Sequence, residues 1–406
     1  MNKEEKANGS WPSPSAFWFF TVALISKILL KICFGHKVER KIKLEKNKAY
    51  VFISHHASLI DAIMMMDALF PLRFNIVIGR AFYAKKSLKF VVNALKCIPK
   101  SQFALDLAAI KALKSVTADN RAVAIYPEGK VSSDGKGLYY IPAGISKLIK
   151  MLDAEVVMVK SGGSFCARPK YGASFRFGKL KSVVDRVLTQ EEVRKLSCEE
   201  IHKKVTECLA YNDNIYQQEN NIRFKCKNPA LGLHRGLYKC PKCGVEYQMR
   251  STATHLICDA CGNSVQYTEY GRLIPEEGSV AFERLDLWND YQRKACREEL
   301  QTPDFYLETP CKCYFNSGGA DEYAGEGKAY INKERIGYKG TFFGEPYEYS
   351  LPLKTQHTLT VKTREWIDLV NEKGILGLQF SENKYSAKFG LLVEENYRLN
   401  ELKESL

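Results

Sequence analysis

Two histidines and an aspartate follow the apolar stretch Val51-Phe52-Ile53 closely enough to form one site. His56 precedes Asp61 by five residues, and a regular helix turns by about 100° per residue, so within one helix the two side chains would diverge. They can meet if His56 lies in the turn before a helix and Asp61 lies in its first turn. Ser58 as N-cap of a Ser-x-x-Asp box predicts such a helix start. A histidine oriented by a carboxylate can act as a general base.

A purely structural interpretation is the alternative, with Asp61 as a capping acid and His56 as a turn histidine. His55 is a rival for the role of base. Its six-residue separation from Asp61 fits that role less well, and we interpret His55 as a packing residue.

Short apolar runs alternate with helical patterns through the first half of the chain. Strands are predicted at residues 49–53, 74–78, 97–100, 122–126 and 155–159, and helices at 59–69, 88–95 and 105–116. This alternation predicts an α/β domain with a largely parallel sheet. Functional groups of such folds collect at the carboxyl ends of strands. The His56 turn and the turn Pro127-Glu128-Gly129 both follow a predicted strand.

These motifs resemble those of the 1-acylglycerol-3-phosphate acyltransferases, over about residues 50–165. The family has a His-x4-Asp box, a basic residue after a strand, a Phe-Pro-Glu-Gly-Thr-Arg-Ser box and a late strand with proline. His56 and Asp61 match the first box, Lys100 stands where arginine is usual, and Tyr126-Pro127-Glu128-Gly129 with Ser132 matches the third. Lys130, Val131 and Met158 depart from the pattern, which leaves the acceptor open.

The resemblance implies transfer of a fatty acyl group from acyl-CoA or acyl carrier protein to lysophosphatidate, which gives phosphatidate. Another lysophospholipid acceptor is the alternative. His56 would remove the proton of the acceptor hydroxyl while Asp61 orients the imidazole, so no serine or cysteine nucleophile is needed.

Cations are expected around the phosphate of the acceptor. Lys100, Lys130 and Arg80 are the candidates, and solvated surface lysines are the alternative for the first two. Glu128 would hydrogen-bond an acceptor hydroxyl or brace its turn, and Gly129 would supply a tight turn.

The segment from residue 16 to residue 34 is apolar except for Lys27 and Lys31, which are four residues apart and therefore share a helical face. Its uninterrupted apolar part is too short to span a bilayer, and no signal-peptide cleavage site follows it. With the formal net charge of +14, this predicts a helix lying on anionic lipid at the cytoplasmic face of the membrane, peripheral or monotopic. A core helix and a tilted span are the alternatives.

Two Cys-x-x-Cys-Gly motifs in the second half of the chain resemble a zinc ribbon. Their cysteines are Cys240, Cys243, Cys258 and Cys261. Four thiolates satisfy a tetrahedral Zn²⁺ without an open position, so a structural zinc is predicted. Four ordinary buried cysteines are the alternative. The remaining cysteines are scattered, as in proteins of a reducing compartment.

Four parts are expected along the 406 residues. They are a membrane-associated helix with its lead-in (1–46), the α/β acyltransferase domain (47–225), the zinc ribbon (236–270), and a helix plus a mostly-β domain capped by a final helix (278–406). The element order of the last part is similar to that of a pleckstrin-homology-like sandwich. Two helices are expected within 189–218.

A membrane-tethered scaffold, whose ribbon and β domain bind nucleic acid or protein, is the non-enzymatic hypothesis. A scaffold would need neither the His56–Asp61 pair nor the Pro127-Glu128-Gly129 turn. We therefore favour the acyltransferase and do not expect a nucleic-acid partner.

Overall fold

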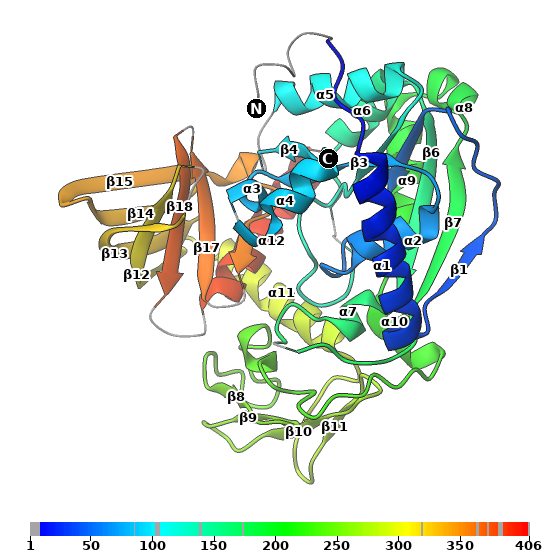
Figure 1. The fold of residues 1–406 in the computed structure, drawn as a ribbon. Helices are drawn as coiled ribbons and strands as arrows, with labels where there is room; N and C mark the ends of the chain where they lie inside the picture. The colour runs from blue at the N-terminus through cyan, green and yellow to red at the C-terminus, as the bar shows by residue number, and fades with distance from the viewer. Residues whose placement is uncertain are drawn as a thin grey trace. The chain divides into compact units, whose positions relative to one another are not determined.

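The computed structural model describes residues 9–84, 86–101, 106–137, 140–172, 174–317, 320–362, 365–371, 373–380 and 385–404. The chain forms two compact units (Figure 1). Unit 1 runs to Arg168 and resumes over Arg176–Phe224. Unit 2 consists of Pro169–Phe175 and the chain from Lys225 onward. Leu105, where one helix was expected to begin, lies outside the described residues.

Unit 1 is built on a seven-stranded sheet whose order is β1-β7-β6-β2-β5-β3-β4. The strands are β1 (Lys37–Arg40), β2 (Tyr50–Ile53), β3 (Phe74–Gly79), β4 (Ile98–Lys100), β5 (Ala122–Ile125), β6 (Glu155–Gly162) and β7 (Lys181–Leu188). The five strands from β6 to β4 run parallel to one another, whereas β7 pairs antiparallel with β6 and carries β1 alongside. The largely parallel sheet agrees with the expectation. The edge formed by β7 and β1, antiparallel to the other strands, was not predicted.

Helices cover both faces of this sheet (Figure 1). They are α1 (Ala16–Phe34), α2 (Asp61–Leu69), α3 (Ala81–Ala84), α4 (Lys86–Ala94), α5 (Leu107–Ala118), α6 (Gly144–Leu152), α7 (Ser164–Ala167), α8 (Gln190–Lys195), α9 (Cys198–Leu209) and α10 (Asp213–Glu219). Residues 189–218 thus hold three helices rather than the expected two. Capping boxes at Thr189 and Ser197 begin α8 and α9.

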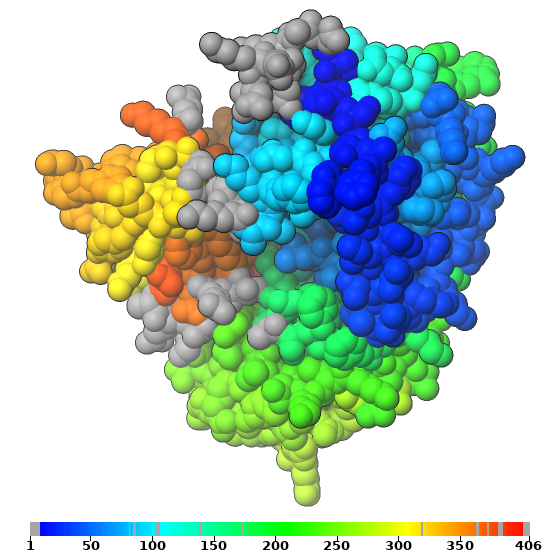
Figure 2. Space-filling view, viewed as in Figure 1, coloured from blue at the N-terminus to red at the C-terminus, as the bar shows by residue number. Residues whose placement is uncertain are grey.

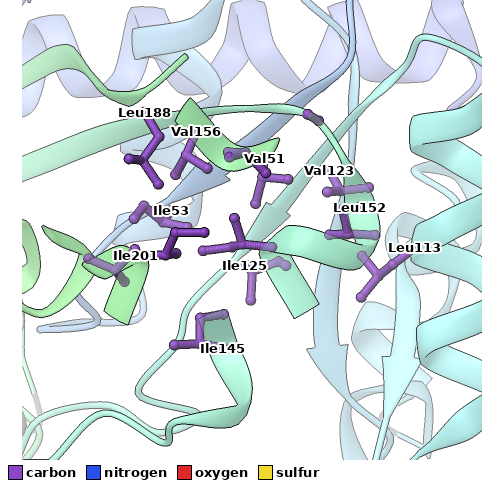
Figure 3. Packing of buried hydrophobic residues seen from close by; sticks show 14 of the residues in the cluster. Val51, Ile53, Leu113, Val123, Ile125, Ile145, Leu152, Val156, Leu188 and Ile201 are labelled. Carbon is purple, nitrogen blue, oxygen red and sulfur yellow. The ribbon is translucent and has the colours of Figure 1, made fainter. Parts of the chain in front are cut away.

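The side chains of the central strands alternate between two apolar cores, because successive residues of a strand point to opposite faces. Val51 and Ile53 of β2 join the core beneath α5, α6 and α9 (Figure 3). Tyr50 and Phe52 join the other core, together with residues of α1, α2 and α4. Both faces of the sheet are buried, so the strands are continuous apolar runs.

Unit 2 contains two antiparallel sheets. The small one has the order β11-β10-β9-β8, with β8 (Met249–Ser251), β9 (His255–Cys258), β10 (Ser264–Tyr267) and β11 (Leu273–Pro275). The large one has the order β15-β14-β13-β12-β18-β17-β16, with β12 (Tyr306–Asn316), β13 (Glu322–Asn332), β14 (Arg335–Phe342), β15 (Glu345–Pro352), β16 (Thr360–Lys362), β17 (Trp366–Asn371) and β18 (Gly374–Phe380). The helices are α11 (Leu285–Gln301) and α12 (Tyr385–Glu404), with short 3₁₀ turns at Leu233–Arg235 and Leu353–Thr355.

Helix α11 binds the small-sheet region through the side chain of Gln292. Its amide oxygen accepts hydrogen bonds from the N–H groups of Tyr238 (2.7 Å) and Lys239 (3.0 Å), and its amide nitrogen donates to the carbonyl of Gly236 (2.9 Å). The indole of Trp288 donates to the carbonyl of Lys239 at 2.9 Å. Four hydrogen bonds from buried side chains therefore fix this region to α11.

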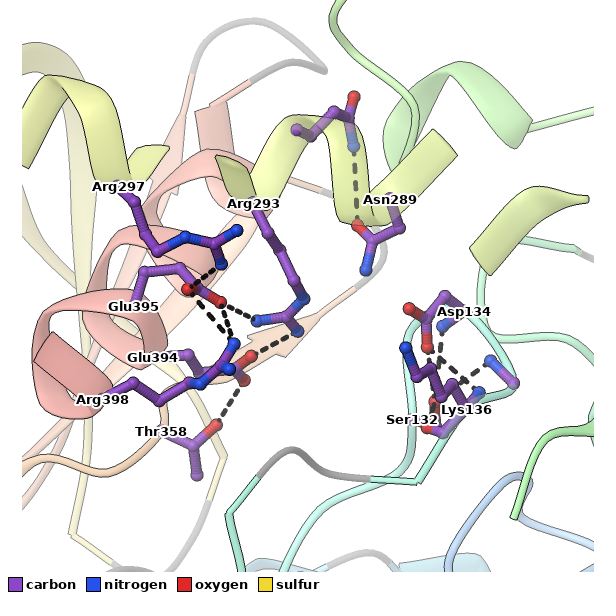
Figure 4. A network of polar contacts seen from close by, with 12 residues as sticks. Ser132, Asp134, Lys136, Asn289, Arg293, Arg297, Thr358, Glu394, Glu395 and Arg398 are labelled. Carbon is purple, nitrogen blue, oxygen red and sulfur yellow. Dashed lines mark hydrogen bonds and ion pairs between the residues drawn. The ribbon is translucent and has the colours of Figure 1, made fainter. Parts of the chain in front are cut away.

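A buried ion network joins α11 to α12 (Figure 4). The Arg293 guanidinium lies 2.6 Å from Glu394 and 2.8 Å from Glu395, and Arg297 lies 2.5 Å from the other oxygen of Glu395. Thr358 donates a further hydrogen bond of 2.8 Å to Glu394. Buried charges are tolerated when they are paired in this way, and the network ties α12 to the rest of unit 2.

Candidate active site and metal centre

His56 and Tyr126 reach the same edge of the unit 1 sheet because their strands are neighbours. β2 and β5 are parallel, with Ile53 opposite Ile125. His56 lies three residues beyond Ile53, and Tyr126 follows Ile125 directly. Their rings stack with centroids 4.3 Å apart and planes inclined by 24°. The parallel pairing therefore brings the first and third motifs together.

The His56 imidazole is oriented by Asp61. Its Nδ1 lies 3.0 Å from Oδ2 of Asp61, whose side chain is fully buried, while the His56 side chain keeps 19% of its exposure. A carboxylate oxygen can only accept, so Nδ1 carries the hydrogen, and in the neutral imidazole Nε2 has a lone pair. The exposed part of the ring can therefore accept a proton from a bound molecule.

The start of α2 differs from the capping box expected from the sequence. Asp61 is the first helical residue and Ile60 is the N-cap, without a capping side chain. The Ser58 hydroxyl donates instead to the carbonyl of Arg168 (2.8 Å). The Ser58 N–H donates to Oδ2 of Asp61 at 2.8 Å, so the tight turn holds the same carboxylate oxygen that faces His56.

The turn after β5 holds the backbone of His56 on both sides. The His56 N–H donates to Oε1 of buried Glu128 (3.1 Å), and the Ser132 N–H donates to the His56 carbonyl (2.8 Å). Gly129 closes this turn at a φ of +68°, where its N–H reaches the Tyr126 carbonyl at 3.0 Å. Glu128 therefore braces the backbone of the turn that carries His56.

His55 belongs to a different environment from its neighbour. Its Nε2 lies 2.8 Å from the carbonyl of Ser161 at the end of β6, and its ring stacks on Tyr211 at 4.2 Å. Burial lowers the pKa of His55 to about 4. His55 is therefore a neutral, buried packing residue at pH 7, as the sequence interpretation expected.

Arg80 and Lys100 meet at the ends of β3 and β4. Arg80 donates to the Ser101 hydroxyl (2.9 Å) and forms an ion pair with Asp106 (3.0 Å), the N-cap of α5. Nζ of Lys100 donates to the carbonyl of Ser101 at 2.9 Å, and burial lowers the pKa of Lys100. Arg80 thus connects Ser101, which follows β4, to Asp106, which precedes α5.

The sheet order separates the candidate cations from His56 by different amounts. β4 lies three strands from β2, so the Lys100 backbone is about 14 Å across the sheet from that of His56 at roughly 4.8 Å per strand. Lys130 follows β5, the direct neighbour of β2, and lies two residues before Ser132, which bonds His56. Lys130 is therefore the nearer cation along the sheet edge.

Sequence reasoning missed Asp213. Its buried carboxylate accepts hydrogen bonds from the N–H groups of Gly163 (2.6 Å) and Phe165 (2.6 Å) and from the Tyr211 hydroxyl (2.8 Å). Burial raises the pKa of Asp213 to about 7. Asp213 lies about 50 residues along the chain from the turn that it braces after β6. The sequence around Asp213 therefore does not indicate this role, and the pair Gly162-Gly163 was the only local sign of the turn.

The four cysteines of the two Cys-x-x-Cys motifs converge in unit 2. The Sγ atoms of Cys240, Cys243, Cys258 and Cys261 all lie within 4.8 Å of one another. The Cys240–Cys261 and Cys243–Cys258 pairs are 3.7 and 3.8 Å apart, too far for a disulfide bond. Such a set of soft ligands could hold a metal ion with all four positions filled by protein.

The two cysteine turns repeat one backbone geometry. Gly244 and Gly262, at φ of +73° and +72°, donate to the carbonyls of Cys240 (3.0 Å) and Cys258 (2.9 Å). The N–H groups of these two cysteines in turn donate across the turn to Val245 and Asn263, at 2.9 and 2.8 Å. The left-handed glycines let each turn present two sulfur atoms to one point.

Residues 35–165 match the family model described as Acyltransferase. Among solved structures, the chain is similar to the crystal structure of the 1-acyl-sn-glycerophosphate (LPA) acyltransferase PlsC from Thermotoga maritima. The TM-score is 0.39 at 18% sequence identity, and the match covers 47% of this chain and 76% of that one. No curated protein matches the chain.

Proposed function

We propose that the chain, whose residues 35–165 match the Acyltransferase family model, acylates lysophosphatidate with His56 as the general base. The observation that carries the assignment of the base is the contact between His56 Nδ1 and Asp61 Oδ2 at 3.0 Å. It leaves Nε2 of a partly exposed ring to accept the proton of a substrate alcohol.

The proposed reaction needs no enzyme nucleophile. His56 Nε2 takes the proton of the acceptor hydroxyl while the oxygen forms a bond to the thioester carbonyl carbon. The carbon–sulfur bond then breaks, and the departing thiolate takes the proton back from the imidazolium. Asp61 holds the correct tautomer and stabilises the imidazolium. Acyl-CoA and acyl carrier protein both supply such a thioester.

The acceptor phosphate is proposed to contact Lys130 and Lys100, with Lys130 the nearer to His56 along the sheet edge. Arg80 is a weaker candidate because its guanidinium is paired with Asp106 at 3.0 Å. Lysine offers a compact point charge rather than a bidentate fork, which suits a phosphate monoester of variable orientation.

The test is acylation of lysophosphatidate by the purified protein in its native form and as His56→Ala and His55→Gln. Loss of a general base lowers the rate on the order of 10²- to 10⁴-fold, so His56→Ala should fall in this range. His55→Gln should stay near the native rate, because the Gln amide can still donate to Ser161. Equal rates for native protein and His56→Ala would reject the base.

A panel of acceptors with different headgroups identifies the substrate. Lys130→Met should raise the KM for lysophosphatidate and leave the KM for a zwitterionic lysophospholipid unchanged, because only the former presents an unshielded phosphate monoester. Preference of the native protein for a zwitterionic acceptor would instead support the alternative substrate.

We also propose that α1 lies on the membrane surface rather than spanning it. The helix is long and apolar enough to cross a bilayer. One face, with Phe19 and Ala23, is part of the domain core, where it covers Met65 and Phe74. Withdrawing α1 into a bilayer would expose that core to water, at about 25 cal/mol per Å² of apolar area.

The opposite face of α1 is the membrane-facing surface in this proposal (Figure 2, dark blue). It exposes large apolar side chains, among them Phe17 at 69% and Ile32 at 77%. Lys27 and Lys31 are exposed on the same helix, and Lys27 lies over the Phe70 ring at 5.3 Å. Partial insertion of this face with the lysines at anionic headgroups fits a monotopic protein. None of the thirteen cysteines, all within the described part of the chain, forms a disulfide bond, which fits the cytoplasmic side.

Zinc is the metal we propose for the four cysteines. Tetrahedral coordination at about 2.3 Å places sulfur atoms about 3.8 Å apart. The Cys240–Cys261 and Cys243–Cys258 separations of 3.7 and 3.8 Å agree with this value. With four protein ligands the ion would have a structural role.

A further inference from the structure

The ring of Tyr126 is an unassigned contact of the candidate base. It stacks on the His56 imidazole at a centroid distance of 4.3 Å and an angle of 24°. The two rings come from the ends of neighbouring parallel strands, so backbone pairing fixes their separation. The Tyr126 hydroxyl is buried, and burial raises its pKa well above the usual range. The phenol is therefore neutral and held by the protein interior.

The other contacts of His56 do not by themselves fix the rotation of its imidazole about the terminal side-chain torsion. Asp61 bonds the imidazole at one atom, Nδ1, and Glu128 and Ser132 hold only the backbone. The terminal torsion of a histidine side chain is broad. A flat aromatic face against the imidazole restricts rotation about that torsion, and so fixes the direction in which the Nε2 lone pair points.

The same face is suited to the charge that appears on His56. When the imidazole takes the acceptor proton it becomes a cation, and the π face of a tyrosine attracts a cation. Asp61 then faces the edge of the imidazolium and Tyr126 faces its plane. The attraction arises only after the proton has moved, so it acts on the transition state more than on the bound substrate.

We propose that Tyr126 is a positioning residue for His56 that orients the imidazole and stabilises the imidazolium through its ring face. This inference rests on the proposed acyl transfer to an alcohol. It assigns the role to the aromatic face and not to the hydroxyl, which points into the interior.

The experiment compares native protein with Tyr126→Phe and Tyr126→Leu, using lysophosphatidate and an acyl-CoA. Tyr126→Phe keeps the face and should retain most of the native kcat. Tyr126→Leu should lower kcat by about 3- to 30-fold, the range of a cation–π contact. KM should be unchanged in both, because the ring is proposed to act through His56 rather than on the substrate. Thermal unfolding of each variant accounts for any loss of folded protein.

A double-mutant cycle with His56→Ala tests whether Tyr126 acts through the base. In the His56→Ala background, Tyr126→Leu should have no further effect on single-turnover rates. An equal loss in both backgrounds, a rise in KM, or a native kcat in Tyr126→Leu would overturn the inference while leaving the proposed function in place. Native protein that acylates no lysophospholipid in the panel would overturn the proposed function itself.

Discussion

The buried His55 provides a test of how the two adjacent histidines differ. Its pKa of about 4 in the folded protein lies about 2.5 units below the ordinary value of 6.5. Well above pH 6.5 the imidazole is neutral in the folded and in the unfolded protein, so its burial costs no proton-linked stability. As the pH falls from 6.5 to 4, the unfolded chain binds a proton that the folded protein excludes, so stability is lost.

The loss should amount to about 3 kcal/mol, since each pKa unit corresponds to about 1.4 kcal/mol. His55→Gln removes the titrating group and keeps a donor for Ser161. We expect the native protein to lose about 3 kcal/mol relative to this variant between pH 6.5 and 4. Hydrogen exchange of amides in β2 and β6, followed by mass spectrometry, reports the stability of unit 1 alone.

Comparison at equal pH removes the contributions of other groups. Asp213 changes stability in the opposite sense. Its pKa in the folded protein is raised to about 7, so between pH 4 and 6.5 the folded protein holds a proton that the unfolded chain releases, and stability falls as the pH rises. It is present in both proteins and cancels in the difference. If native protein and His55→Gln lost protection in parallel on acidification, the assignment of His55 as a buried neutral residue would be wrong.

Three further results are expected. Elemental analysis should find about one zinc per chain, and Cys243→Ser should lower this content; native protein without metal would reject the ribbon. Reversing the charges of Lys27 and Lys31 to Glu should weaken binding to anionic vesicles by about 1 kcal/mol or more per charge. The control is the same reversal at exposed Lys294 of unit 2, which should leave binding unchanged. Equal binding of all variants would contradict the surface helix. Arg293→Met should destabilise unit 2 by about 3–5 kcal/mol because both buried glutamates, Glu394 and Glu395, lose the Arg293 guanidinium. An unchanged thermal midpoint would refute the role of that network.

Features with a local signature could be predicted from the sequence. The apolar runs around Val51 and Val123 are strands because both faces of the sheet are buried, which makes the pattern continuous. The cysteine spacing identified the four-sulfur cluster, and the position of His56 before a helix placed it beside Asp61. In each case a few residues that are close in sequence determine the conformation, so the feature can be predicted without knowledge of the fold.

Features that depend on distant partners could not be predicted. β7 was not expected, since its sequence mixes charged and apolar residues without a strict alternation, and its strand character comes from pairing with β6 and β1. The Ser58 hydroxyl leaves the expected capping position because the carbonyl of Arg168, 110 residues away, is a partner within reach. The function of Asp213 likewise depends on a turn in another part of the chain.

The double role of α1 sets a practical condition for obtaining this protein in aqueous solution. Cutting off the N-terminal 34 residues would remove Phe19, Ala23 and Leu30 from the interior, and the shortened chain would be expected to aggregate rather than dissolve. Replacing outward-facing side chains such as Phe17, Leu24 or Ile32 with polar residues would keep the inner face in place. Detergent or lipid nanodiscs would serve the same purpose for the native chain.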